Sequence, residues 1–287
     1  MYSLDGKAIA KRILETLKEK PRPDKALAAI FVGDNPQSQS FLKQKEKMAQ
    51  ELEIQFQLHR FPETISAQDL IRAIQAIGND SKVGGMIVQL PLPTGFSRDE
   101  IIAAIPPAKD VDALTPQSRA LVDPLPVAVL KEILRVTHYH LSIKTVAVVG
   151  RGFLVGQPII EWLKGETRSR TRTGWRQNRK ELRQPRCKKL LLFHSKSDLT
   201  KIRQADLIIT GVGKGGLITQ AMIKPGAHLI DFGYDTKEGK IVGDFNPMPY
   251  AISHTPLTNI GWYTPTPSGT GPILVAEIFR NFYQLNR

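Results

Sequence analysis

The stretch TVAVVGRGFLVGQPIIEWLK, residues 145–164, gives the clearest indication of the fold. Its first five residues are those of a buried strand, and its last seven have the apolar spacing of a helix. Gly150, Gly152 and Gly156 lie between the two. A glycine turn from a strand into a helix presents backbone N–H groups to which the phosphates of a dinucleotide can bind. Close packing of the helix on the strand, without any ligand, would also favour glycines here.

The alternation of strand and helix continues on both sides of this stretch. Such an alternation predicts mostly parallel sheets with helical crossovers, and therefore an α/β protein. The strands around Gly150 predict a doubly wound nucleotide-binding unit, and the earlier strands predict a second α/β unit. The other expected strands are 26–33, 54–61, 84–93, 190–194, 206–213 and 228–233.

Positive charge is concentrated in one segment of the chain. The net charge is +13, and the segment Glu166–Lys189 alone holds ten Arg or Lys and two Glu, a local charge of +8. Connections between a helix and the next strand usually take about two to six residues, so this segment is an insertion. It lacks periodicity and is too charged to bury, which predicts a disordered surface loop. Its arginines and Trp175 could bind RNA, or the loop could simply be solvated.

The remaining composition excludes several classes of protein. Cys187 is the only cysteine, which excludes an intramolecular disulfide and argues against a cysteine-rich metal site. We expect no metal. No run approaches the roughly 18 apolar residues of a membrane span, and the first residues lack the apolar core of a signal peptide. We therefore expect a cytoplasmic protein without a membrane partner.

The end of the second strand of the nucleotide-binding unit indicates which cofactor binds. Domains that prefer NAD usually place Asp or Glu there, to bind the ribose 2′-hydroxyl. This chain has His194, Ser195 and Lys196 instead, and Arg151 lies in the glycine turn. A hydroxyl and cations suit a 2′-phosphate, so NADP is expected, unless these side chains are simply solvated.

Lys45 interrupts the apolar face of an expected helix. Phe41, Lys45, Met48 and Leu52 fall on one side of that helix by i, i+4 and i+7 spacing. The amine could extend to solvent while its stem packs. Alternatively the amine lies in a cleft, where desolvation lowers its pKa and makes it an acid/base group near neutral pH.

Two further polar residues lie at ends of expected strands, where α/β proteins bind ligands. Gln89 is enclosed in VQLPLP, and Asp112 follows another Asp in KDVD. Both have a structural alternative. Gln89 could be a hydrogen-bonded core amide, and Asp112 could cap a helix or a turn.

The ordered set of motifs resembles the bifunctional methylenetetrahydrofolate dehydrogenase/methenyltetrahydrofolate cyclohydrolase family. The resemblance runs through nearly the whole chain except the basic insertion, and VQLPLP followed by KDVD is quite specific. The motifs that carry it are DGKAIA (5–10), GDNPQSQSFLKQK (33–45), GGMIVQLPLP (84–93), KDVDAL (109–114), GRGFLVGQP (150–158), HSKS (194–197), KPGAHLIDFGYD (224–235), KIVGDF (240–245) and TPTPSGTGP (264–272).

The resemblance implies an activity of two steps. Family members oxidise 5,10-methylenetetrahydrofolate with NADP to methenyltetrahydrofolate, and then add water to form 10-formyltetrahydrofolate. It implies that Lys45 is the general acid/base, that Gln89 hydrogen-bonds and tunes it, and that Asp112 holds the pterin ring. The residues implied in substrate binding are Phe41, Leu90, Pro91, Pro267, Gly269 and Pro272, and those implied in cofactor binding are Gly150, Arg151, Gly152, Val155, Gly156 and Ser195.

The resemblance also implies an architecture. A substrate domain is expected from residues 1–138 together with the C-terminal helix in 265–287. A Rossmann-like NADP-binding domain is expected from 139–264, with the basic insertion at about 166–189 and a cleft between the two domains. Family members usually form homodimers, so a homodimer is expected.

Several positions depart from the usual family pattern. Phe41 stands where tyrosine is usual, Ala113 and Ser268 stand where glycine is common, and Tyr234-Asp235 replace a usual Ile-Asn. Without the tyrosine hydroxyl, hydrolysis could be impaired while hydride transfer survives. A third interpretation is a non-catalytic relative that binds nucleic acid through the arginine-rich insertion.

Overall fold

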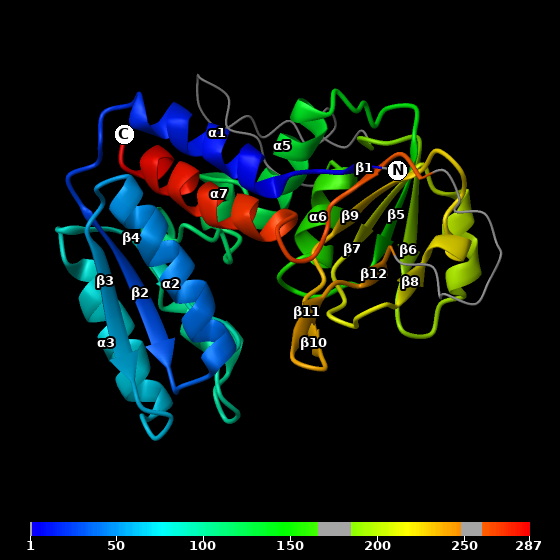
Figure 1. The fold of residues 1–287 in the computed structure, drawn as a ribbon. Coiled ribbons are helices and arrows are strands. Elements are labelled where there is room, and N and C mark those ends of the chain that lie inside the picture. The colour runs from blue at the N-terminus through cyan, green and yellow to red at the C-terminus, as the bar shows by residue number, and fades with distance from the viewer. Residues whose placement is uncertain (1, 166–184, 248–259) are drawn as a thin grey trace. The chain divides into compact units, whose positions relative to one another are not determined.

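The structure is a computed structural model that describes residues 2–165, 185–247 and 260–287 (Figure 1). Contacts within the chain divide it into two compact units. We call them the glycine-turn unit, Met1–Ala10 with Pro126–Leu274, and the lysine unit, Lys11–Leu125 with Val275–Arg287. Each is described by itself.

A six-stranded parallel sheet forms the centre of the glycine-turn unit, in the order β1-β13-β9-β7-β5-β6. The strands from β9 to β6 show the expected parallel pairing, with β5 between β7 and the edge strand β6. The strands are β1 (Tyr2–Ser3), β5 (Thr145–Val149), β6 (Lys189–Phe193), β7 (Leu207–Thr210), β9 (His228–Asp231) and β13 (Trp262–Tyr263).

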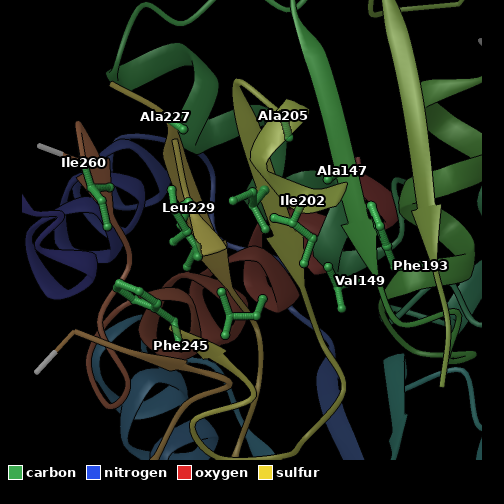
Figure 2. Close-up of a cluster of buried hydrophobic side chains, with 12 residues drawn as sticks. Ala147, Val149, Phe193, Ile202, Ala205, Ala227, Leu229, Phe245 and Ile260 are labelled. Atoms are coloured by element: carbon green, nitrogen blue, oxygen red, sulfur yellow. The ribbon is translucent and has the colours of Figure 1, made fainter. Parts of the chain in front are cut away.

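Side chains from neighbouring strands of this sheet form a buried core (Figure 2). Ala147, Val149 and Leu229 are at most 3% exposed, and they pack with apolar side chains from the connections between strands. This packing explains why the apolar runs could be recognised as strands. The remaining elements of the unit are α6 (Gly156–Leu163), η3 (Leu199–Gln204), β8 (Ile218–Thr219), η4 (Gln220–Met222), the hairpin β10 (Asp235–Lys237) and β11 (Lys240–Val242), and β12 (Phe245–Asn246).

A three-stranded parallel sheet in the order β3-β2-β4 forms the centre of the lysine unit, with α2 and α3 to either side of the sheet (Figure 1). Leu70 and Ile74 of α3, one helical turn apart, are fully buried against Ile30 and Val88 of the sheet. The elements are β2 (Ala26–Val32), α2 (Pro36–Glu51), β3 (Phe56–Phe61), α3 (Ala67–Asn79), β4 (Val83–Val88), α4 (Arg98–Ala103), η1 (Pro107–Lys109) and η2 (Ser118–Ala120).

The C-terminal helix belongs to the lysine unit from Val275 onward, and its first residues belong to the glycine-turn unit. This helix, α7 (Thr270–Leu285), carries the buried Asn281, whose amide donates to the carbonyl oxygens of Val111 at 2.8 Å and Asp123 at 2.9 Å. Asn286 donates to the carbonyl oxygen of Gly84 at 3.0 Å. The two parallel sheets and their helices confirm the predicted α/β class.

The units divide the chain differently from the expected boundaries of 1–138 and 139–264. Residues 1–10 belong to the glycine-turn unit because β1 pairs with β13 and extends its sheet. Residues 126–138 belong there as well, on α5 (Leu125–Val136), and α1 (Gly6–Lys18) crosses from one unit into the other. Strand pairing of two residues is too short a pattern to predict from sequence.

Most of the basic insertion, 166–184, lies outside the described residues. The prediction that these residues are disordered therefore falls outside them as well. Its last residues are structured, against our expectation for 166–189. The backbone N–H of Arg186 donates to the Leu163 carbonyl oxygen at 2.8 Å, and Cys187 is buried. Lys189 begins β6. Within the described ranges, no helix is long and apolar enough to cross a membrane.

Candidate functional site

Helix α2 carries the lysine that the sequence singled out. The Asn35 side chain caps it by accepting the Ser38 backbone N–H at 2.9 Å, and Pro36 occupies the first turn, where a missing N–H costs nothing. The buried residues of the helix are Ser38, Leu42 and Ala49. This stripe is one position away from the stripe that we expected.

Lys45 lies at the margin of the buried face. Phe41, Lys45 and Met48 are all half-buried, whereas Leu52, just after the helix, is buried. The expected row therefore exists, but it flanks the core instead of facing it. A lysine at such a margin keeps its stem packed and can place its amine beside other polar groups.

Gln89 receives that amine. It follows β4, where its backbone N–H donates to the Ile30 carbonyl oxygen at 2.9 Å, and it is 7% exposed. The Lys45 Nζ donates to its side-chain Oε1 at 2.9 Å, and its Nε2 donates to the Leu90 carbonyl oxygen at 2.7 Å. Because the amide nitrogen is engaged by Leu90, the amide oxygen faces Lys45.

Asp112 is the charged neighbour of this pair. Burial lowers the pKa of Lys45, and the charge of Asp112 partly opposes that shift. Burial likewise raises the pKa of Asp112 to about 6, against the opposing effect of Lys45. Both pKa values are thus displaced toward the neutral forms, and the pKa of Asp112 lies close enough to neutral pH for its carboxylate to exchange a proton there.

The loop that carries Asp112 is fixed by another carboxylate, Asp110. Asp110 forms a parallel β-bridge with Met86 and is fully buried. Its Oδ2 accepts the backbone N–H groups of Leu114 at 2.9 Å and Thr115 at 3.1 Å, and the Ser118 hydroxyl at 2.5 Å. The capping role considered for Asp112 therefore belongs to Asp110. The Asp112 carboxylate instead acts on Lys45 through its charge.

The other predicted substrate residues of the lysine unit adjoin this group. Phe41 is one turn before Lys45 on α2, and Leu90 and Pro91 follow Gln89 directly. Leu90 packs on the core of the unit, whereas Pro91 is exposed. The unit thus holds Lys45, Gln89 and Asp112 together with an apolar border.

In the glycine-turn unit, the three glycines have different reasons to be glycine. Gly150 has a φ of +93°, which favours glycine, and its N–H donates to the Phe193 carbonyl oxygen at 3.0 Å. A Cβ on Gly156 would overlap the Gly150 carbonyl oxygen. A Cβ on Gly152 would meet nothing within 4 Å. Only Gly152 therefore leaves open space, as an approaching phosphate would need.

The predicted cofactor residues follow the carboxyl ends of the neighbouring strands β5 and β6. Val149 pairs with Phe193, so the glycine turn and the residues after β6 leave the sheet side by side. Arg151 and Ser195 are both exposed there. Val155 contacts the loop after β7, where a Cβ on Gly211 would overlap its side chain.

Sequence reasoning missed the group that fixes the loop after β7. The buried carboxylate of Asp244 accepts the Thr210 hydroxyl at 2.6 Å and the backbone N–H groups of Val212 and Lys214, each at 2.7 Å. Val212 is also near the glycine turn, 3.0 Å from where a Cβ on Gly150 would lie. The only signal was KIVGDF, in which nothing distinguishes this aspartate from a surface residue.

The TPTPSGTGP loop is held against the end of β9. The Thr270 hydroxyl donates to the Asp231 carbonyl oxygen at 2.8 Å, and Gly269 is buried with no room for a Cβ. Ser268 has a φ of +80°, a conformation that favours glycine. The other two predicted substrate residues of this loop are Pro267, which is exposed, and Pro272, which is half-buried.

Most of the predicted site residues form two groups, one in each unit, whereas the predicted substrate residues Pro267, Gly269 and Pro272 belong to the glycine-turn unit. Lys45, Gln89 and Asp112 are together in the lysine unit, and the glycine turn, Arg151 and Ser195 are together in the glycine-turn unit. Among the described residues, no group of three or more His, Cys, Asp or Glu could hold a metal ion.

The fold and these two groups define a class: two-domain α/β proteins with a dinucleotide-type glycine turn in one domain and a half-buried lysine–carboxylate pair in the other. Residues 4–112 match the tetrahydrofolate dehydrogenase/cyclohydrolase catalytic domain, and residues 124–287 match the NAD(P)-binding domain of the same family. The chain belongs to the tetrahydrofolate dehydrogenase/cyclohydrolase family.

Individual relatives agree with this assignment over nearly their whole length. The bifunctional protein FolD of an Exiguobacterium species is 34% identical over 294 residues, covering 97% of this chain and 96% of the relative. The crystal structure of the bifunctional enzyme FolD from Campylobacter jejuni is 31% identical, with a TM-score of 0.83, and covers 98% of this chain and 97% of its own. A bifunctional enzyme from Thermoplasma acidophilum is 27% identical, with a TM-score of 0.80 and coverage of 99% and 97%.

The different environments of Gly152 and Gly156 predict opposite results for substitution by alanine. Gly152→Ala should unfold at the wild-type temperature but bind NADP about tenfold more weakly, because its methyl group points into open space that a phosphate needs. Gly156→Ala should lose about 1–3 kcal/mol of stability through overlap with Gly150. Thermal unfolding and calorimetric NADP titration measure both effects. Unchanged NADP affinity in Gly152→Ala would show that the phosphate does not approach there.

Proposed function

We propose that the protein oxidises 5,10-methylenetetrahydrofolate with NADP to methenyltetrahydrofolate and hydrolyses that product to 10-formyltetrahydrofolate. Membership of the family and the relatives described as bifunctional support both activities. The observation that carries the proposal is the 2.9 Å hydrogen bond from Lys45 to Gln89 beside Asp112. The comparisons support neither a dehydrogenase without hydrolysis nor a non-catalytic nucleic-acid binder.

Lys45 is proposed as the acid/base of the hydrolytic step. The methenyl substrate is a cation, so a fully protonated amine would repel it and could not accept a proton from the attacking water. Burial lowers the pKa of Lys45 and so makes the neutral amine available. Gln89 then holds the amine in one place, since its own amide is oriented by Leu90.

Asp112 is proposed to hold the pterin. Its Oδ1 is buried and, within the described part of the chain, has no hydrogen-bond partner. An acceptor left in that state is costly unless a ligand supplies a donor, and the pterin ring carries N–H groups. Phe41 is proposed to contribute an aromatic face that contacts the folate; a phenyl ring needs no hydroxyl for that contact.

NADP is proposed over NAD. The cofactor would supply the hydride acceptor for this oxidation. The open space at Gly152 fits a phosphate, and the cation of Arg151 and the hydroxyl of Ser195 fit a 2′-phosphate at the same edge. His194 to Lys196 include no acid that would favour a ribose hydroxyl.

Lys45→Met should separate the two activities. We expect its hydrolysis of methenyltetrahydrofolate to fall by roughly 10²–10⁴-fold, because the acid/base group is lost, while NADPH still forms. The purified protein is given 5,10-methylenetetrahydrofolate and NADP, and NADPH and methenyltetrahydrofolate are followed separately. Wild type should form NADPH without lasting methenyl accumulation, and Lys45→Met should accumulate it.

The matched control is Lys43→Met, which removes an exposed lysine from the same helix and should behave as wild type. Full hydrolysis by Lys45→Met would end the proposed role of Lys45. Accumulation of methenyltetrahydrofolate by wild type would mean that Phe41 is insufficient for hydrolysis. No NADPH from folded wild type would contradict the proposed function itself.

Arg151→Ala/Ser195→Ala should reduce kcat/KM with NADP by about tenfold or more and leave kcat/KM with NAD nearly unchanged, because only NADP carries the 2′-phosphate. Lys201→Ala, which removes an exposed cation from η3, is the control. Steady-state rates with each cofactor measure the ratio. Equal losses with NADP and NAD would assign these two residues another role.

A cytoplasmic homodimer is proposed as the working form, on the precedent of the family. A homodimer has twice the 32.0 kDa mass of the chain. Sedimentation of the purified protein therefore distinguishes a monomer from a dimer. A single species at the mass of one chain, at concentrations where the protein is active, would contradict the dimer.

A further inference from the structure

The turn that carries Asp112 contains a residue in an unfavourable backbone conformation. Ala113 has a φ of +52°, in the left-handed region that residues other than glycine rarely adopt, and it is 1% exposed. A strained residue of this kind persists only when its surroundings hold it in place. Asp112 is its direct neighbour, so the groups that hold Ala113 also determine where the Asp112 carboxylate points.

The Arg119 side chain donates hydrogen bonds to the carbonyl oxygens of this turn. Its Nε donates to the Ala113 carbonyl oxygen at 3.2 Å, and its Nη2 reaches the Leu114 carbonyl oxygen at 3.5 Å. A guanidinium offers donors in a rigid planar fork, so one side chain can engage two successive carbonyl groups. The arginine itself is half-buried and lies on η2, where its own backbone N–H donates to the Thr115 carbonyl oxygen at 3.1 Å.

Asp110 and Arg119 act on opposite polar groups of the same turn. Asp110 accepts the N–H groups of Leu114 and Thr115, whereas Arg119 donates to the carbonyl groups of Ala113 and Leu114. The peptide groups after Asp112 are therefore held from both sides. The Asp110 carboxylate accepts only donors, so it cannot hold the carbonyl oxygen of Ala113. The left-handed conformation of Ala113 sets the direction of that carbonyl group, and Arg119 donates to it.

The geometry points to Arg119 as a positioning residue for Asp112. Arg119 holds Ala113 in its left-handed conformation and so fixes the Asp112 carboxylate beside Lys45. This inference rests on the proposed function for its kinetic consequences, but its structural part concerns the turn alone. It predicts a specific dependence: the need for Arg119 should fall when residue 113 adopts the left-handed conformation without strain, as glycine does.

The test is a double-mutant cycle of Arg119→Met and Ala113→Gly in the full chain. Arg119→Met should reduce kcat/KM for 5,10-methylenetetrahydrofolate and the rate of methenyl hydrolysis by about tenfold, since small misplacements of catalytic groups have effects of that size. Its KM for NADP should not change. Ala113→Gly added to Arg119→Met should restore most of both losses, and Arg119→Lys should retain part of the function, since it keeps a donor without the fork.

The control is Arg72→Met, which removes an exposed arginine from α3 of the same unit and should leave all rates unchanged. Arg119→Met with wild-type kinetics on the folate substrates would overturn the inference. So would losses that Ala113→Gly fails to restore, or an equal rise in the KM for NADP.

Thermal unfolding separates this inference from the proposed function. Ala113→Gly should raise the Tm more in the Arg119→Met background than in wild type, whether or not the protein has activity. Equal shifts in both backgrounds would overturn the inference even in a fully active enzyme. If Arg119→Met does not fold, the same comparison is made with Arg119→Lys. In that case, a double variant Arg119→Met/Ala113→Gly that folds although Arg119→Met does not would support the inference.

Discussion

The hydrogen bond from the Lys45 amine to Gln89, made in a buried setting beside Asp112, is the interaction on which the proposed chemistry depends. Burial without a polar partner would be too costly for an amine, and a fully paired ammonium would not release its proton. Gln89 satisfies the amine without adding a charge, and Asp112 offsets only part of the desolvation. Burial therefore favours loss of the Lys45 proton at a pH below the ordinary pKa of a lysine.

Both units fix their functional loops by the same means, a buried aspartate that accepts backbone N–H groups. Asp110 holds the turn that presents Asp112, and Asp244 holds the loop after β7 next to the glycine turn. Hydrogen bonds from backbone N–H groups to these carboxylates add to the packing that orders the two loops. The sheets then act as rigid supports, and the precision of each site depends on its carboxylate.

Much of the fold could be predicted from the chain because its strands are short apolar runs separated by glycine, proline and polar turns. Lys45 could be singled out because it interrupts the apolar face of a helix, and Gln89 because it interrupts an apolar strand run. The roles of Asp110 and Asp244 could not be predicted, since most of their hydrogen-bond partners are backbone N–H groups, which leave no trace in the sequence. The exact buried stripe of α2 was also missed, because residues at the margin of a core have the same composition as residues within it.

The ionisation of Lys45 tests the central claim most directly. In protein labelled with carbon-13 at the lysine side chains, the Lys45 signal is assigned by its absence from Lys45→Met and followed by NMR as the pH rises. The account predicts that Lys45 loses its proton below the ordinary pKa of 10.5, and at still lower pH in Asp112→Asn, because the negative charge that favours the ammonium is gone. A Lys45 that titrates at or above 10.5 in folded wild-type protein would contradict it.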